Sequence, residues 1–139
     1  MPVSKPSELP AGGDGRWPLC GQGFRSQRWG DLEVGYTTCD PADHTALYAG
    51  LPGGVCPCPH YGYVFAGRIR CHYAGSQWPD EVAVAGDAYF FRAGHVLIYE
   101  EATEALELNP ADALEVLMDH IELKAQAMVA ELQAGQPSD

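Results

Sequence analysis

Short apolar runs separated by turn residues dominate the middle of the chain. Runs of strand-forming residues occupy positions 29–39, 60–66, 68–73, 81–85, 88–91, 96–99 and 104–108, and Gly, Pro or charged residues separate them. Strands at this spacing are typical of an antiparallel sandwich or barrel. Because no helix-length pattern lies between the runs from 60 to 108, the sequence predicts an all-β region without βαβ units.

The C-terminal quarter has a different period. Asn109 suits a helix N-cap, Pro110 the first helical position, and Gly135 a helix stop. Between them, apolar residues recur at three- and four-residue steps: Leu114, Leu117, Met118, Ile121, Ala125, Met128 and Leu132. We therefore expect one amphipathic helix over 109–135, packed on its own barrel or on a partner's.

Composition supports one globular domain in three parts. The 139 residues are 46% hydrophobic and 19% charged, and a chain of this size can bury a single core. Residues 1–27, rich in Pro, Gly and charge, read as an N-terminal arm, 28–108 as the barrel and 109–135 as the helix. No run approaches the roughly 18 apolar residues of a membrane span, so we expect no membrane partner.

Charge and cysteine content limit the partners and the compartment. A formal net charge of −11 should repel phosphate backbones, which disfavours a nucleic-acid role. The five cysteines are an odd number, and no apolar stretch follows a basic region at the N-terminus. Free thiols and the lack of a secretory signal predict a cytoplasmic protein.

The segments HYGYVFAGRIR and AGDAYFFRAGH resemble the two motifs of the cupin superfamily, which are small β-barrels of the jelly-roll type. Gly67 closes the first motif, Gly86 opens the second, and Gly94 follows eight residues later, as the family pattern requires. Eighteen residues separate Gly67 from Gly86, a spacing similar to that of short cupins. The resemblance covers residues 30–108 and implies a double-stranded β-helix, or jelly-roll barrel, with a small-molecule pocket.

The metal ligands of the cupin motifs do not carry over. His60 occupies the family's glutamate position, and Gly54 and Cys56 occupy its two histidine positions. In the second motif, residues of other types replace the proline, histidine and asparagine: Arg92, Leu97 and Glu101. The usual three-histidine, one-glutamate metal site is therefore not expected, and the resemblance leaves the reaction open.

A different ligand set is available at the same place. In an extended strand Cys56, Cys58 and His60 would share one face, and His95 lies two residues before the second-motif histidine position. Thiolates with imidazoles suit Zn²⁺, and such a mixture is also open to ferrous iron. We expect a site for one divalent metal at Cys56, His60 and His95, with Cys58 as a less secure fourth member.

A metal-free interpretation stays open beside it. Buried cysteines commonly act as small hydrophobic residues, and Pro57 and Pro59 make the strand start irregular. Redox sensing would further require a lowered thiol pKa. By strand alternation from Leu97, Tyr99 and Glu101 are expected to line the cavity.

Two classes of function fit these residues. The chain could be an enzyme acting on a small molecule, or a non-catalytic sensor that binds a metabolite or a metal. On the face opposite His60, Tyr61, Tyr63 and Phe65 form an aromatic surface. Small cupins that this chain resembles commonly dimerise through such faces, which implies a homodimer.

Overall fold

Nine β-strands and one long α-helix make up the computed structural model, which describes residues 3–135. The strands are β1 (Phe24–Trp29), β2 (Leu32–Cys39), β3 (Ala42–Asp43), β4 (His60–Ala66), β5 (Arg68–His72), β6 (Glu81–Val84), β7 (Ala88–Phe91), β8 (Val96–Tyr99) and β9 (Thr103–Pro110). The helix is α1 (Ala111–Ala134), and three 3₁₀ turns are η1 (Pro6–Glu8), η2 (Thr45–Tyr48) and η3 (Pro52–Gly54). In this part of the chain no helix is long and apolar enough to cross a membrane.

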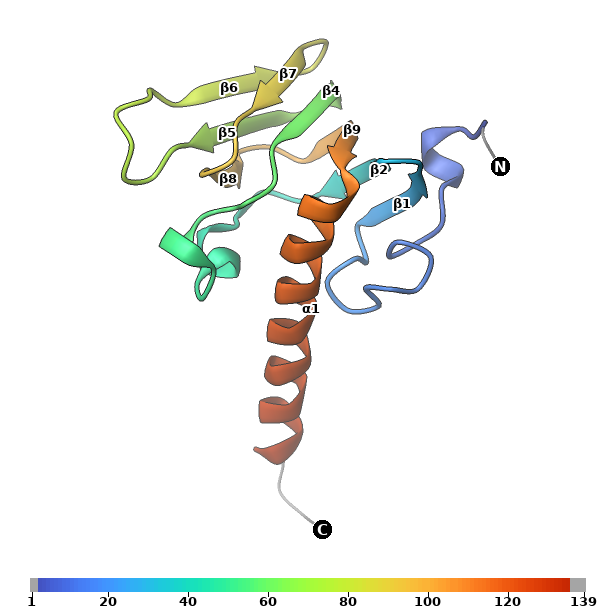
Figure 1. The fold of residues 1–139 in the computed structure, drawn as a ribbon, viewed down its shortest axis with the longest axis vertical. Helices are drawn as coiled ribbons and strands as arrows, with labels where there is room; N and C mark the ends of the chain where they lie inside the picture. Colours follow the sequence, from blue (N-terminus) through green and yellow to red (C-terminus); the bar gives the residue numbers. More distant parts are fainter. Residues whose placement is uncertain (1–2, 136–139) are drawn as a thin grey trace.

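The strands form two antiparallel sheets with jelly-roll connectivity. One sheet has the order β1-β2-β9-β4-β7 and the other β3-β8-β5-β6. Strand β2 pairs with β9, β3 lies against β8, β4 against β7 and β5 against β6. Such nested pairs form when a long β-hairpin folds over and wraps into two sheets. The topology is therefore a double-stranded β-helix. Figure 1 shows the sheets above the helix, which leaves β9 directly.

Two apolar clusters fill the molecule. The first lies between the sheets and contains Val64, Ile69, Cys71, Tyr73, Phe91, Leu97, Tyr99 and Ala105, among others. Cys71 has no exposed surface and is a core thiol of this cluster. The second joins the N-terminal segment, the start of β4 and the helix through Trp17, Phe24, Tyr48, Cys56, Cys58, Leu114, Leu117 and Met118.

Gly67 makes the tight turn between β4 and β5. Its φ is +99°, and an added Cβ would overlap the backbone of Ala102 and Thr103. Glycine adopts this left-handed conformation without the steric cost that other residues meet. The glycine that closes the first motif is therefore required by the close approach of the β8–β9 connection.

The first strand predicted from sequence is shorter than expected, and a further strand precedes it. Residues 29–39 were expected to form one strand, but Gly30 and Asp31 form a turn, so β2 begins at Leu32 and pairs with β1, most of which lies in the predicted N-terminal arm. The arm also packs on the helix, because Trp17 is 1% exposed and its indole N–H donates to Asp119 Oδ1 at 2.9 Å. The expected domain limits at 27 and 108 thus fall within β1 and β9.

The predicted start of the helix is wrong by one residue, since the first helical residue is Ala111 and not Pro110. Asn109 was expected as N-cap, but β9 continues to Pro110, because the ladder to β2 extends to Leu32↔Pro110. The N-cap is Pro110, and the helix ends at Gly135 as predicted. Asn109 instead points into the molecule with no exposed surface.

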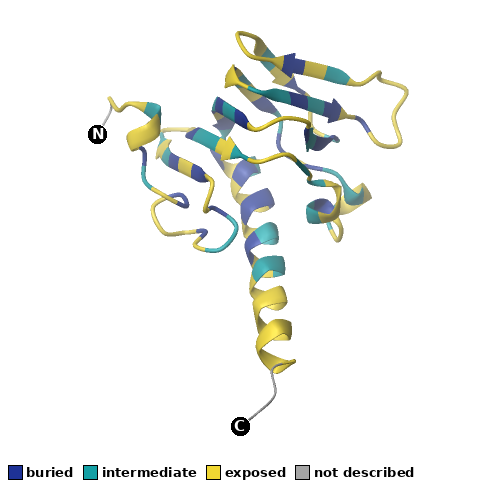
Figure 2. Cartoon of the chain, turned by 180° about the vertical axis from the view of Figure 1, so that it is seen from behind, coloured by how far each residue is buried: buried dark blue, intermediate teal, exposed yellow. Residues whose placement is uncertain are grey.

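The helix has two different halves. Leu114, Leu117 and Met118 pack in the second cluster, whereas Met128 and Leu132 are 61% and 69% exposed. Figure 2 shows the same change from buried to exposed along the helix as it extends away from the sheets. The apolar stripe predicted from sequence is therefore covered by its own chain only in its first half.

Candidate functional site

A bridge between two distant segments brings Cys56 to His95. The backbone N–H of Cys56 donates to the carbonyl of His95 at 2.8 Å, and the N–H of Gly94 donates to the carbonyl of Cys56 at 2.8 Å. Cys56 lies before β4 and His95 before β8, so this isolated antiparallel bridge joins the two motif segments. Both side chains are fully buried.

His60, the first residue of β4, completes a group of three. Its Nε2 lies 3.6 Å from Cys56 Sγ, and its ring centroid lies 4.9 Å from that of His95. One ligand atom from each of Cys56, His60 and His95 can be chosen so that all three lie within 4.8 Å of one another. Bond lengths to zinc are about 2.0–2.3 Å, so small side-chain adjustments would bring all three atoms onto one ion.

The Nδ1 atom of each histidine lies against a hydrogen-bond acceptor. His60 Nδ1 lies 3.0 Å from Asn109 Oδ1, and His95 Nδ1 bonds the carbonyl of Arg92. Each Nδ1 faces an acceptor, so when the ring is neutral the proton lies on Nδ1 and Nε2 carries the lone pair. Metal-binding histidines show this arrangement, in which an outer acceptor fixes the tautomer and the ring orientation.

His95 Nε2 is a buried polar atom with no hydrogen-bond partner among the described residues. Such atoms are uncommon, because leaving one unsatisfied costs free energy. A metal ion bound to the lone pair would satisfy it. The donor set therefore fits a divalent ion on geometry and on chemistry.

A buried carboxylate lies beside the group. Glu107 Oε2 accepts from the Tyr89 hydroxyl at 2.6 Å, Oε1 accepts from Asn109 Nδ2 at 3.1 Å, and Oε1 lies 3.6 Å from His60 Nδ1. Gly62 makes this possible, since a Cβ there would overlap the Tyr89 ring. Glu107 and Asn109 were not predicted as site residues, although both occupy alternate positions of β9 that face inward.

The two histidines have opposite pKa shifts. Burial lowers the pKa of His95 to about 4, with a further contribution from the charge of His60. Burial also acts to lower the pKa of His60, but the Glu107 carboxylate and the neighbouring thiols Cys56 and Cys58 raise it well above the ordinary value. The His95 imidazole is thus readily neutral, whereas the His60 imidazole is coupled to the negative charge of Glu107.

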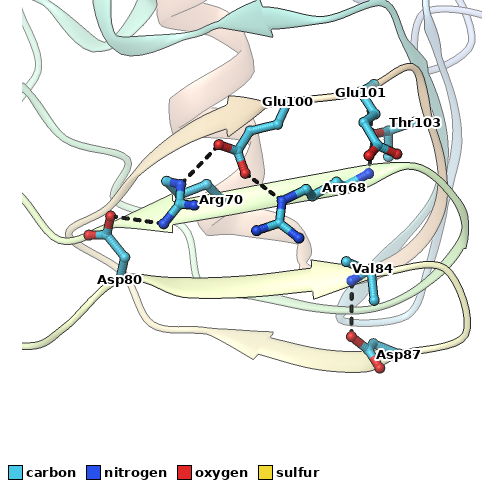
Figure 3. Close-up of polar contacts among 8 residues, drawn as sticks. All are labelled: Arg68, Arg70, Asp80, Val84, Asp87, Glu100, Glu101 and Thr103. Atoms are coloured by element: carbon cyan, nitrogen blue, oxygen red, sulfur yellow. Dashed lines mark hydrogen bonds and ion pairs between the residues drawn. The ribbon is translucent and has the colours of Figure 1, made fainter.

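Of the remaining predicted site residues, Cys58 is next to His60 without belonging to the three-residue group, and Glu101 lies apart from it. Cys58 is fully buried, and its Sγ lies near the Pro59 carbonyl at 3.2 Å. It is not part of the three-residue group, because the chain between Cys56 and His60 is irregular rather than extended. Glu101 is exposed in the β8–β9 turn, beside Thr103 and the Arg68–Glu100–Arg70–Asp80 ion pairs (Figure 3).

A pocket between the five-stranded sheet and the helix reaches the group at His60. We call it the His60 pocket; its volume is about 320 Å³. Tyr99 lines it as predicted, Glu101 does not, and apolar side chains make up much of its wall: Phe24, Tyr48, Leu97, Leu114, Leu117 and Met118. Small-molecule sites are commonly apolar clefts with a few polar groups, and here those groups include His60 and Glu107.

Comparison with known proteins finds similarity in structure and none in sequence. No protein-family model matches the chain, and no curated protein matches it. The ethanolamine utilization protein Q of Salmonella typhimurium is 18% identical with a TM-score of 0.49, covering 78% of this chain and 85% of its own. KdgF from a Halomonas species is 16% identical with a TM-score of 0.42, covering 70% and 89%.

A cupin-2 domain protein from Shewanella frigidimarina is 10% identical with a TM-score of 0.37, covering 59% of this chain and 72% of its own. These similarities concern the fold. The nested strand pairs of the two sheets are those of a jelly roll, and the glycine-bearing turns lie where the two motifs predict them. The chain has a cupin-type fold with one C-terminal helix.

Proposed function

We propose that Cys56, His60 and His95 hold one divalent metal ion, zinc or ferrous iron, beside a small-molecule pocket. The observation that carries this proposal is the convergence of one buried thiol and two imidazole Nε2 atoms whose Nδ1 atoms are anchored. Three protein ligands leave a coordination position open, which is typical of catalytic rather than structural zinc sites. A metal with an open position polarises a carbonyl or lowers the pKa of a bound water.

The side chains around the pocket have separate tasks in this proposal. Phe24, Leu114 and Leu117 exclude water and contact the apolar part of a ligand. Glu107, held by Tyr89 and Asn109, presents a carboxylate that can accept a proton from a bound molecule. These tasks support small-molecule chemistry. A non-catalytic sensor of a metabolite or metal is the alternative, and a fourth protein ligand such as Cys58 closing the coordination would favour it.

The test is the metal content of protein purified without a polyhistidine tag and reconstituted anaerobically with Zn²⁺ or Fe²⁺. We expect about one ion per chain, lost in Cys56→Ala and in His60→Ala. Cys71→Ala is the matched control, because it removes a buried thiol outside the group and should retain the metal. A parent protein that binds neither ion would overturn the proposal.

We further propose a homodimer formed through an aromatic face, defined as Tyr61, Tyr63, Phe65, Phe90 and Leu108. These side chains are 41–47% exposed on the outer side of the five-stranded sheet, and the Tyr61 and Phe90 rings stack at 4.8 Å. A large side chain of this kind has about 200 Å² of surface, so five of them, each a little under half exposed, present roughly 400 Å² of apolar surface. One side of a standard interface is about 800 Å², of which rather more than half is non-polar.

The area thus matches one side of a dimer. Glu104, beside Phe65, and Arg92, 6.0 Å from the Phe90 ring, lie at the margin of the face, and its apolar centre can pair with itself across a two-fold axis.

A cytoplasmic location is also proposed. It is supported by the state of the cysteines, all five of which are free, as is usual in a reducing compartment.

A further inference from the structure

Acidic groups outnumber basic groups in the lining of the His60 pocket. The lining includes two carboxylates, Asp40 and Glu107, and none of the described residues that line it is a lysine or an arginine. Glu107 is 7% exposed, accepts hydrogen bonds from Tyr89 and Asn109, and lies 3.6 Å from the His60 ring, so one imidazole stands against two carboxylates. A carboxylate taken out of water is costly unless a positive charge or hydrogen bonds compensate it.

Basic side chains near the pocket are engaged elsewhere. Lys124 Nζ donates to the carbonyls of Ala46 and Ala49 at 3.0 Å each, outside the pocket lining. His44 packs against Tyr99 with ring centroids 4.9 Å apart. Burial lowers the pKa of His44, so it is neutral at pH 7. Hence, among the described residues that line the pocket, no basic group other than His60 is available to offset Asp40.

The walls suit the hydrocarbon part of a ligand. Leu114, Leu117 and Met118 approach from the helix, and three aromatic rings from other elements complete the lining: Phe24, Tyr48 and Tyr99. Aromatic faces attract organic cations as well as apolar groups. At about 320 Å³, the pocket is near the lower end of the range for ligand sites.

We propose that the His60 pocket takes a small, mostly apolar molecule with a single positive charge, such as a protonated amine, and rejects carboxylates of the same shape. The inference rests on the proposed function in that it uses the same pocket. It does not require the metal, because the two carboxylates and the aromatic walls belong to the chain itself.

The experiment compares three probes of nearly equal shape: benzylamine, benzyl alcohol and benzoate. Their dissociation constants are measured by calorimetry on the metal-depleted and on the zinc-treated protein. We expect benzylamine to bind at least ~10-fold more tightly than benzoate to the metal-depleted protein, with benzyl alcohol between them. In the zinc-treated protein the preference should shrink, because a carboxylate can occupy an open coordination position. Glu107→Gln should reduce this preference several-fold.

Glu115→Gln is the matched control. It removes the same charge from an exposed helix position outside the pocket lining and should leave the preference unchanged. If Glu107→Gln does not fold, Asp40→Asn, at an exposed position of the lining, should reduce the preference in its place.

Benzoate binding to the metal-depleted protein as tightly as benzylamine would overturn the inference, and so would the absence of binding by all three probes. Loss of the preference in Glu115→Gln to the same extent as in the pocket variant would also overturn it. A preference for benzylamine in a protein that binds no metal would support this inference while contradicting the proposed metal site. The two can therefore fail separately.

Discussion

Asn109 fixes the orientation of the His60 ring. Its Oδ1 lies 3.0 Å from His60 Nδ1 and its Nδ2 donates to Glu107, so one buried amide orients both groups. We predict that Asn109→Ala lowers zinc affinity about 10- to 100-fold, the usual effect of losing such an outer partner. Asn109→Asp keeps an acceptor and should lose less. Competition with a chromophoric chelator measures both, and equal affinity in all three proteins would contradict the proposed role.

Two thiols, the buried Cys71 and the half-buried Cys20, should be almost inert. Burial raises the pKa of Cys71 to about 12, and burial with the hydrogen bond and charge of Glu122 raises that of Cys20 to about 12. At pH 8 about one in ten thousand of such thiols is ionised, against roughly a quarter for an ordinary cysteine.

We therefore predict that Cys20 and Cys71 resist iodoacetamide at pH 8 in the folded protein and react readily in urea. Peptide mass spectrometry reports each site separately. Equal rates in the two conditions would show that these thiols are not protected by the fold. The result also bears on redox sensing, which the raised pKa values of both cysteines disfavour.

At the scale of elements, two carboxylates of the helix bind the N-terminal segment: Asp119, which accepts from the Trp17 indole, and Glu122. Glu122 Oε1 accepts the backbone N–H groups of Leu19 and Cys20 at 3.0 and 2.9 Å, and the residue is 5% exposed. Burial alone would raise the pKa of Glu122, but these two donors outweigh it and the pKa is lowered. The carboxylate therefore stabilises the fold above its unfolded pKa, and this contribution is lost as the pH falls through the folded value.

We predict that Glu122→Gln lowers the free energy of unfolding by about 1 kcal/mol at pH 7, and that the difference from the parent shrinks below about pH 4. Urea denaturation at several pH values measures it. Glu131→Gln, at an exposed position of the same helix, is the control and should change stability little. A Glu122→Gln difference that persists unchanged at low pH would contradict this account.

At the scale of the whole molecule, charge and the aromatic face act in opposite directions. Each chain carries a formal charge of −11, so two copies repel one another, while the face contributes apolar burial. Salt screens the repulsion and leaves apolar burial intact. We predict a dimer whose dissociation constant falls as NaCl rises from about 50 to about 500 mM, measured by sedimentation velocity.

A charge placed on the aromatic face should abolish this dimer. Tyr63→Lys is predicted to give a monomer at all salt concentrations, because the new ammonium would be buried without a partner. Val116→Lys changes an exposed helix residue outside the face and should still dimerise. A parent protein that stays monomeric, or a Tyr63→Lys protein that remains a dimer, would contradict the proposed interface.

Much of the candidate site could be predicted because its residues follow strand alternation and the motif frame. His60 and His95 come together through the positions that the two motifs assign to facing segments, and Cys56 joins His95 through a backbone bridge. Cys58 was harder to place, since Pro57 and Pro59 interrupt the alternation that its assignment assumed. Glu101 was misplaced for a similar reason, because β8 ends at Tyr99 and the chain turns outward after it.

By itself, the sequence determined the local features: the strand runs, the glycine turns, the helix stripe and the glycine frame of the two motifs. These features depend on residues that are close in sequence, because backbone sterics and the strand and helix periods determine them. Only the tertiary structure decided that Asn109 belongs to the site rather than to a helix cap. It also brought Glu107 to His60 and left half of the helix stripe exposed. Each of these depends on which distant strand lies alongside, and pairing with β2 and β4 is what turns alternate residues of β9 inward.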